Sequence, residues 1–212
     1  MALPLAAWVA IAGGAAVVTY IGKKIYDKAT EDSSSPIPIV TIFLTGESGV
    51  GKDTILHILK DGKFKKSHKP TPNLENESFV TCEKRLCVIN TGGAEDNNDE
   101  NTEAGKYLPD NTQYVYVFKA DDYFADKKVE KQVDLVLEIY KELCERDKYT
   151  LKIIGTHKDK CLENGISEDK IKTLVDNLSK KGKCKIYDLT KFNNKLMQQT
   201  LCEFITNEEE KR

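Results

Sequence analysis

Hydrophobic and polar positions divide most of the chain into short strand-like runs that alternate with helix-like runs. Runs rich in β-branched and aromatic residues predict strands, and apolar residues three and four positions apart predict helices. Strands are predicted at 38–45, 78–83, 85–90, 113–119, 150–155 and 183–188. Helices are predicted at 54–59, 126–146, from 167 onward and at 194–205.

Runs 78–83 and 85–90 are close enough in sequence to form a hairpin, while the later strands are separated by helices. Strands joined through helices favour parallel pairing, with helices on both faces of the sheet. The expected fold class is therefore α/β, with a mostly parallel six-stranded sheet flanked by helices.

The N-terminal segment 3–22 has a different pattern, because it is uncharged and rich in Ala, Val, Ile and Leu. About 20 residues at 1.5 Å each match the thickness of a hydrocarbon core, so the segment predicts one transmembrane helix in a lipid bilayer. Lys23, Lys24 and Lys28 follow it, which places the C-terminal domain in the cytosol of a single-pass membrane protein. A signal peptide or a buried core helix is the alternative, although no basic residue precedes the run.

These patterns divide the 212 residues into four parts: a membrane anchor (1–22), a polar juxtamembrane linker (23–37), a folded domain (38–206) and a charged tail (207–212). The formal net charge of −2 gives no electrostatic footprint for nucleic acid. Six cysteines occur without a C-x-x-C pair, so neither a zinc site nor a disulfide framework is indicated. Buried reduced thiols are expected in a cytosolic domain.

A glycine-rich segment, GESGVGKDT at 46–54, lies between the first predicted strand and the first predicted helix. This arrangement predicts a phosphate-binding P-loop, whose backbone N–H groups and following helix N-terminus attract a polyphosphate. Lys52 is expected to reach the β- and γ-phosphates and to stabilise charge during phosphoryl transfer. The residues expected to bind nucleotide here are Gly46, Ser48, Gly49, Val50, Gly51, Lys52, Asp53 and Thr54.

Asp53 departs from the usual pattern, in which a Ser or Thr hydroxyl after the lysine binds Mg²⁺. A carboxylate also binds Mg²⁺, but it lies near phosphate oxygens of the same sign. Either the metal is held differently, or binding is weakened.

Three further segments lie where a Ras-like small GTPase carries its nucleotide motifs, and together with the P-loop this resemblance covers about residues 38–206. Lys69-Pro70-Thr71-Pro72 resembles switch I, which implies that Thr71 contacts Mg²⁺ and the γ-phosphate; an ordinary proline turn is the alternative. The run 88–93, VINTGG, is similar to the Arf-like motif ending in Gly-Gly.

That similarity implies a Mg²⁺ ligand at Asn90, where the family has an aspartate, and a backbone contact to the γ-phosphate at Gly93. Ala94 stands where hydrolysing members carry a water-orienting glutamine. The metal set implied by the resemblance is therefore Asp53, Thr71 and Asn90, and the substitutions imply slow or partner-dependent hydrolysis.

The run 153–159, IIGTHKD, is similar to the guanine-recognition motif in its Thr-x-x-Asp form, as in Roc and dynamin-type domains. The resemblance implies that Asp159 accepts hydrogen bonds from guanine N1–H and N2–H₂, that His157 lies against the purine, and that Thr156 belongs to the same site. Thr190, in a segment aligned with the family's Ser-Ala-Lys loop, is a further candidate for the base site.

Taken together, the resemblance implies a membrane-anchored protein that binds GTP and GDP with Mg²⁺ and acts as a cytosolic-side switch or recruitment platform. The order of anchor and domain also resembles the beta subunit of the signal recognition particle receptor. A protein effector or activating protein is expected to bind through the switch segments, which are flanked by a basic block (60–69) and an acidic block (95–103). The second hypothesis is a pseudo-GTPase membrane adaptor, and the third is a P-loop nucleotide kinase.

Overall fold

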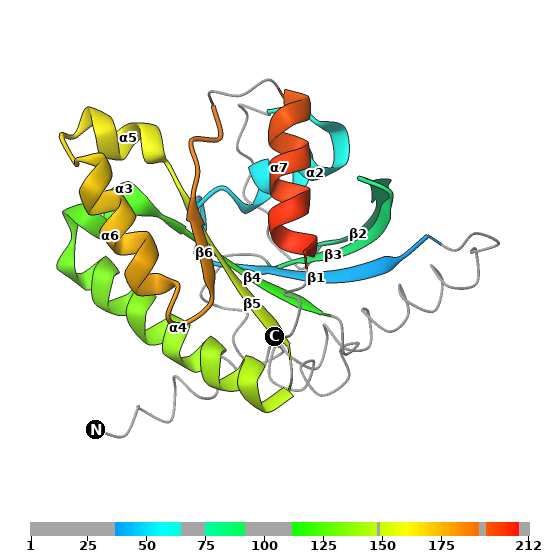
Figure 1. Ribbon diagram of the computed structural model, residues 1–212, viewed down its shortest axis with the longest axis horizontal. Coiled ribbons are helices and arrows are strands. Elements are labelled where there is room, and N and C mark those ends of the chain that lie inside the picture. The colour runs from blue at the N-terminus through cyan, green and yellow to red at the C-terminus, as the bar shows by residue number, and fades with distance from the viewer. Residues whose placement is uncertain (1–36, 65–74, 92–111, 148, 191–193, 208–212) are drawn as a thin grey trace.

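The computed structural model describes residues 37–64, 75–91, 112–147, 149–190 and 194–207. Within these ranges a six-stranded sheet has the order β2-β3-β1-β4-β5-β6 (Figure 1). The strands are β1 (Ile39–Thr45), β2 (Glu75–Thr81), β3 (Lys84–Asn90), β4 (Gln113–Lys119), β5 (Thr150–Thr156) and β6 (Lys183–Ile186). Only β2 pairs antiparallel, with β3, and the other pairs of neighbouring strands are parallel.

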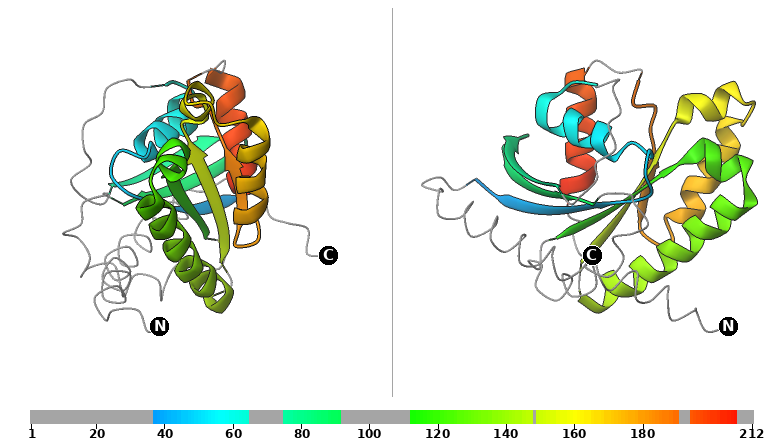
Figure 2. Two further views of the ribbon diagram at one scale, coloured as in Figure 1. Left: turned by 90° about the vertical axis from the view of Figure 1, so that its left-hand side faces the viewer. Right: turned by 180° about the vertical axis from the view of Figure 1, so that it is seen from behind.

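Two groups of helices cover the two faces of this sheet (Figures 1 and 2). One face carries α2 (Lys52–Asp61) and α7 (Asn194–Thr206). The other carries α3 (Ala120–Ala125), α4 (Lys127–Asp147), α5 (Lys158–Glu163) and α6 (Glu168–Leu178). The mostly parallel sheet between helices agrees with the sequence prediction.

The alternation of side chains along each strand produces two separate hydrophobic cores. On β4, Tyr114, Tyr116 and Phe118 point into the core under α4 and α6, whereas Val115 and Val117 point into the core under α2 and α7. All five are buried, as expected for a central strand covered on both faces. The strand therefore lacks the polar face that a one-sided sheet would show.

Helix α6 shows how local sequence sets an element boundary. Ser167 is its N-cap, with extended backbone angles, and its side-chain oxygen accepts a hydrogen bond from the backbone N–H of Lys170. Ile171, Leu174 and Leu178 form its buried face. Ser, with its short hydroxyl, satisfies one of the N–H groups that a helix start leaves unpaired. The start predicted at Ser167 is confirmed.

Two short helices, α3 and α5, were not predicted from the sequence. Each has six residues and directly follows the carboxyl end of a strand, β4 for α3 and β5 for α5. Segments this short do not form helices alone and show little periodicity. Packing of Ala120 and Cys161, both fully buried, holds them in place.

The predicted fold class needs one correction, because it included a transmembrane helix ahead of the sheet domain. No helix in the described part of the chain is long and apolar enough to cross a membrane. The segment 3–22, where the span was expected, lies outside the described residues, as do most of the expected linker and the tail from 208. The fold class is therefore an α/β domain with a mostly parallel six-stranded sheet.

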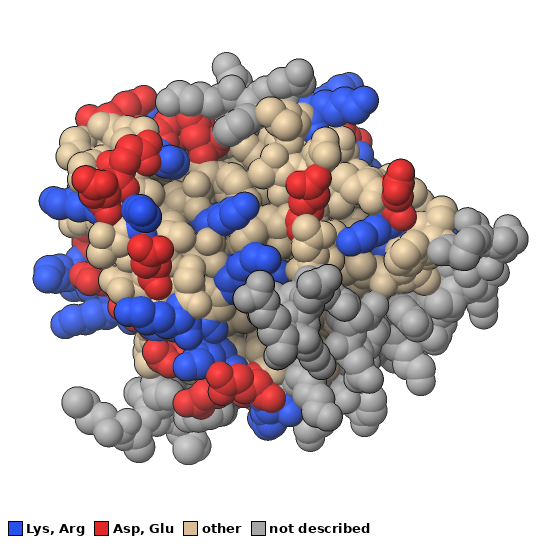
Figure 3. Space-filling view, viewed as in Figure 1, with Lys and Arg blue, Asp and Glu red and all other residues tan. Residues whose placement is uncertain are grey.

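Charged side chains of both signs are interspersed on the face that carries α6, β6 and α7 (Figure 3). Some form ion pairs between exposed or half-exposed groups, such as Lys158 with Glu168 at 2.9 Å and Lys160 with Glu163 at 2.7 Å. Pairs of this kind contribute little to stability.

Unlike these exposed lysines, Lys152 of β5 is fully buried. Its ammonium donates a 2.9 Å hydrogen bond to the carbonyl oxygen of Asn207, the residue after α7.

Candidate functional site

The glycine-rich loop at 46–51 connects the carboxyl end of β1 to the N-terminus of α2. β1 lies between β3 and β4. The strands β2 and β3, which follow β1 in sequence, lie on one side of it, and the later strands β4, β5 and β6 lie on the other side, so the strand order reverses here. Ligands of open α/β sheets bind outside the carboxyl ends of the strands at such a switch point. The position of the loop therefore marks the expected place for a ligand.

The conformation of the loop requires glycine at particular positions. Gly46, Gly49 and Gly51 have φ angles of 143°, 76° and 100°, which L-residues rarely adopt. A Cβ added at Gly46 would lie 2.2 Å from the carbonyl oxygen of Val117, whereas one at Gly49 would meet nothing within 4 Å. Gly46 thus lets the loop pack against β4, and Gly49 faces open space.

Lys52 begins α2 and is almost completely buried. Its ammonium donates hydrogen bonds of 2.7 Å each to the carbonyl oxygens of Gly46 and Glu47. Burial lowers the pKa of Lys52 to about 8, although the negative charges of Asp53 and Glu47 partly oppose this shift. The loop therefore folds around a cation whose burial carries a desolvation cost.

The predicted metal ligands Asp53 and Asn90 lie together, although 37 positions separate them in sequence. Asn90 ends β3 opposite Leu44 of β1, and its side-chain amide donates a 2.9 Å hydrogen bond to the carboxylate of Asp53 in the first turn of α2. Parallel pairing of β3 with β1 brings the two residues to the same edge of the sheet.

These two residues fit a Mg²⁺ ion bound together with phosphate oxygens. Asn90 is fully buried, and its Oδ1 has no hydrogen-bond partner among the described residues. Carboxylate and amide oxygens are hard ligands of the kind that Mg²⁺ prefers, and Mg²⁺ usually takes one or two protein ligands besides phosphates and water. No group of three or more His, Cys, Asp or Glu residues in the described ranges is placed to hold a metal by itself.

Thr156, predicted to belong to the guanine site, lies beneath the P-loop. Its hydroxyl is within hydrogen-bond distance of the carbonyl oxygens of Val50 at 2.8 Å and Phe118 at 3.2 Å, and of His157 Nδ1 at 2.8 Å. The side chain is buried at the end of β5. Thr156 therefore joins the P-loop to the ends of β4 and β5.

His157 and Asp159 begin the short helix α5 at the end of β5. His157 is the N-cap, with a left-handed backbone of φ 59°, and Asp159 is half-buried in the first turn. The backbone N–H of Lys158 donates to the carbonyl oxygen of Tyr187 at 3.2 Å, which fastens this turn to the segment after β6.

In that segment Thr190 donates hydrogen bonds to one carboxylate oxygen of Asp188, from its N–H at 2.9 Å and its hydroxyl at 2.6 Å. The turn carrying Asp159 and the turn carrying Thr190 are thus held side by side, at the same edge of the sheet as the P-loop. Thr71 and Gly93, and with them the two switch-like segments, lie outside the described residues.

Sequence reasoning missed the contacts between the P-loop region and α4. The hydroxyls of Thr45 and Tyr140 are 3.1 Å apart, and Gln132 donates a hydrogen bond to the carboxylate of Glu47. Burial is the largest cause of the raised pKa of Tyr140, so its hydroxyl stays protonated at neutral pH. Because 95 positions separate Thr45 from Tyr140, no local motif predicts this pair.

Comparison with known proteins adds no family to this geometry. No protein-family model matches the chain, and a search of curated proteins found no match. Function is therefore inferred from the residues and their arrangement.

Substituting two loop glycines tests the packing of the P-loop on β4. Gly46→Ala should lower the free energy of unfolding by about 2–5 kcal/mol, because a Cβ collides with Val117 and the φ angle is strained. Gly49→Ala should cost only about 1 kcal/mol, because its Cβ meets open space and only the φ angle is unfavourable. Urea denaturation of both variants measures the difference, and equal losses would contradict this packing.

Proposed function

We propose that this protein binds guanine nucleotides and acts as a switch or recruitment platform with slow or partner-dependent GTP hydrolysis. One observation carries the proposal: a loop with three positive-φ glycines leads into a ten-residue helix that begins with a buried lysine, at the switch point of a mostly parallel sheet. Backbone N–H groups at a helix N-terminus, together with a nearby ammonium, favour a polyphosphate.

The state of Lys52 supports phosphate as the ligand class. Its ammonium bonds to carbonyl oxygens of the loop, and its pKa is lowered to about 8 by burial. A phosphate oxygen beside this ammonium would add to the negative charge that Asp53 and Glu47 already place near it. Bringing the anion next to Lys52 would therefore recover desolvation free energy that the loop carbonyls offset only in part.

The position of Asp159 supports guanine as the base. It follows β5, two strands away from the P-loop strand β1 in the sheet order, and its turn is fastened to the turn of Thr190. A carboxylate accepts hydrogen bonds from both N1–H and N2–H₂ of guanine, a pair of donors that adenine lacks. Thr156 acts as a support here, since its hydroxyl bonds the loop backbone at Val50.

Asp53 and Asn90 are the residues that would hold Mg²⁺, which neutralises charge on the phosphates when bound. The protein's own contribution to hydrolysis would come from Lys52 and the loop amides, which stabilise negative charge on the γ-phosphoryl group. The slow or partner-dependent turnover in this proposal rests on the sequence, because Ala94 stands where the resemblance expects a water-orienting glutamine.

The hydrogen bond between Asn90 and Asp53 favours a second candidate, a pseudo-GTPase that uses the same fold as an adaptor. This bond occupies one carboxylate oxygen of Asp53, a proposed Mg²⁺ ligand. An adaptor would keep the bond permanently and would need no metal.

Analysis of nucleotide bound to the purified full-length protein separates these candidates. Chromatography of the heat-released nucleotide should identify GDP or GTP, and a GTP turnover assay then distinguishes the switch from the adaptor. Protein that is purified empty and does not take up added GDP or GTP would refute nucleotide binding altogether.

Guanine selectivity should depend on Asp159. Asp159→Ala should weaken GDP binding by about 1.5–3 kcal/mol, the range for hydrogen bonds to a charged group, and should leave the fold intact. Asp176→Ala, at an exposed position on α6, is the matched control and should bind GDP normally. Competition by ADP as strong as by GDP in the unmodified protein would contradict this role.

In the proposed Mg²⁺ site, the one carboxylate should be able to stand at either position 53 or position 90. Asp53→Ser should impair Mg²⁺-dependent nucleotide binding because no carboxylate remains, and adding Asn90→Asp should restore it. Since the two side chains are in contact at 2.9 Å, a double-mutant cycle should give a coupling free energy of about 0.5–3 kcal/mol. The cycle is measured on nucleotide affinity with and without Mg²⁺; additive effects would favour the adaptor.

Nucleotide affinity should fall as pH rises above about 8, because Lys52 loses its proton there in the nucleotide-free protein. A bound phosphate favours the charged form, so binding takes up a proton, and affinity drops by up to about tenfold per pH unit. Titration with fluorescent GDP between about pH 6.5 and pH 9.5 measures this slope. The Lys52→Met variant should bind GDP weakly, with an affinity that does not change over this pH range. If the affinity of the unmodified protein does not change with pH either, Lys52 does not contact the phosphates.

A further inference from the structure

The hairpin turn between β2 and β3 has an unusual composition. Thr81 pairs with Lys84, which leaves Cys82 and Glu83 as a two-residue loop with φ angles of 48° and 60°. Such turns need positive φ at both central positions and are normally built from Asn, Asp and Gly. A cysteine here carries a conformational cost, which points to a role for its side chain.

The side chain of Cys82 meets that of Cys202 on α7. The two thiols are hydrogen-bonded to one another, and the hydroxyl of Thr206 bonds to Cys202 as well. Cys82 is exposed, whereas Cys202 is buried. The turn therefore presents one accessible thiol directly against one inaccessible thiol from an element 120 positions away in sequence.

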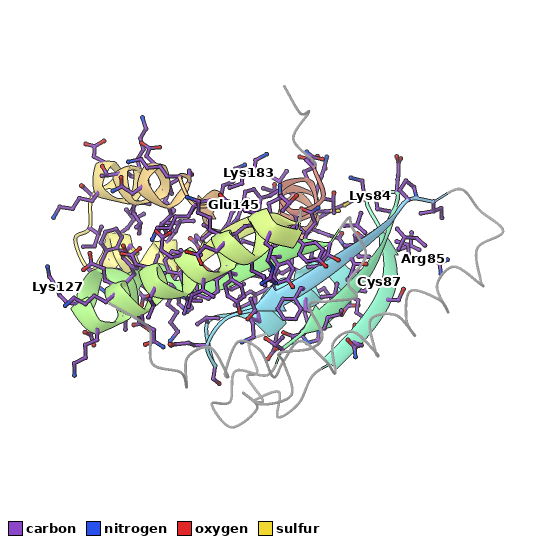
Figure 4. All side chains as sticks on the ribbon, turned by 90° about the horizontal axis from the view of Figure 1, so that it is seen from below. Lys84, Arg85, Cys87, Lys127, Glu145 and Lys183 are labelled. Atoms are coloured by element: carbon purple, nitrogen blue, oxygen red, sulfur yellow. The ribbon has the colours of Figure 1, made fainter. Side chains whose placement is uncertain are left out.

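A lysine fixes the same contact between the hairpin and α7. Lys84, the first residue of β3, donates hydrogen bonds from its ammonium to Thr206, at 2.8 Å to the hydroxyl and 3.3 Å to the carbonyl oxygen. Figure 4 labels Lys84 at this end of β3, with Arg85 and Cys87 following along the strand. These bonds keep the turn next to the last turn of α7, so the two sulfur atoms are positioned before any reaction.

We propose that Cys82 and Cys202 form a reversible disulfide, a redox-responsive modification that fastens the β2–β3 hairpin to α7. The class of oxidant is a small disulfide such as oxidised glutathione. The other four cysteines of the protein are buried, so Cys82 is the one that such a reagent reaches first.

The chemistry proceeds by two thiol–disulfide exchanges. The Cys82 thiolate attacks one sulfur of oxidised glutathione, the glutathione S–S bond breaks, and one glutathione leaves as a thiolate that takes up a proton. Cys202 then attacks the Cys82 sulfur and the S–S bond between Cys82 and glutathione breaks; the second glutathione leaves as a thiolate and takes up the proton lost by Cys202. The two cysteines are together oxidised by two electrons, and oxidised glutathione is reduced to two thiols.

The order of the two steps follows from the environments. Burial, and the hydrogen bond to Cys82, raise the pKa of the Cys202 thiol to about 12 against the opposing charge of Lys84, so Cys202 is a thiol at neutral pH. It cannot meet the reagent, and it reacts only once Cys82 carries the leaving group. This arrangement of an accessible thiol beside a resolving cysteine is typical of redox-responsive pairs.

The bond would join the sheet edge to the helix that packs on α2. Gln198 of α7 donates a 2.8 Å hydrogen bond to the carbonyl oxygen of Leu59 near the end of α2, whose first residue is Lys52. Oxidation would thus restrain the layer formed by α2 and α7 relative to the β2–β3 hairpin.

Reduced full-length protein incubated with oxidised glutathione tests the proposal. Peptide mapping by mass spectrometry without reductant should find the Cys82 peptide linked to the Cys202 peptide, and dithiothreitol should release both. Because the closed loop is long, the oxidised protein should melt on the order of 10 °C above the reduced protein. Cys184→Ser, which removes another buried thiol, is the matched control and should still form the link.

Cys82→Ser, at an exposed position, and Cys202→Ala should each abolish the link and the rise in melting temperature. With Cys202→Ala, glutathione should remain attached to Cys82. The proposal is overturned if the unmodified protein keeps glutathione on Cys82 without transfer to Cys202. It is also overturned if Cys82 links only to a second molecule, or if no cysteine reacts. Should Cys202→Ala not fold, Cys82→Ser and the mapped link in the unmodified protein still decide the question.

Discussion

The close packing of the glycine-rich loop against the carboxyl ends of β4 and β5 is the contact on which the rest of the site depends. Gly46 touches the backbone of Val117 where any side chain would collide, and the Thr156 hydroxyl holds the carbonyl oxygen of Val50. These two contacts fix the position and direction of the first turn of α2. Lys52 and Asp53 lie in that turn, and Asp53 is thereby brought within hydrogen-bond distance of Asn90.

Polar groups are buried at the carboxyl ends of the strands, where burial carries an energetic cost. Lys52 is held by loop carbonyls, Asn90 bonds to Asp53, and Asp188 accepts two bonds from Thr190. Such groups are costly to bury unless their charges and hydrogen bonds are matched. Concentrating them at the carboxyl ends of the strands, while both sheet faces are filled with apolar side chains, is typical of a binding site on a rigid support.

Helix α7 connects the helix that follows the glycine-rich loop, α2, to the β2–β3 hairpin at one side of the sheet. It packs on α2 through Gln198, and its last turn is bonded by Lys84 from the hairpin and is followed by Asn207, which accepts from the buried Lys152. A helix C-terminus leaves carbonyl groups unpaired and carries a partial negative charge, so lysines are favourable partners there. The proposed link between Cys82 and Cys202 lies within this same set of contacts.

Local patterns in the sequence located most of the strands, the long helices and the glycine-rich loop. Alternating and β-branched runs located β1, β3, β4 and β5 closely, and Ser167 marked the start of α6, because these signals depend only on neighbouring residues. The hairpin turn lies at Cys82 and Glu83, whereas the predicted strands put it at residue 84. Both residues adopt a left-handed backbone, which Cys and Glu rarely do, so there was no sign of a turn there in the sequence.

Only the tertiary structure decided what the site residues touch. The sequence predicted Asp53 and Asn90 as metal ligands, but their mutual hydrogen bond arises from the register of β1 with β3. Thr156 was predicted from a motif, and its place under the P-loop depends on β4 and β5 being neighbours. The Thr45–Tyr140 and Cys82–Cys202 contacts join positions far apart in the chain, which no local pattern encodes. Sequence sets which side chains are available, and the packing of strands and helices sets which of them meet.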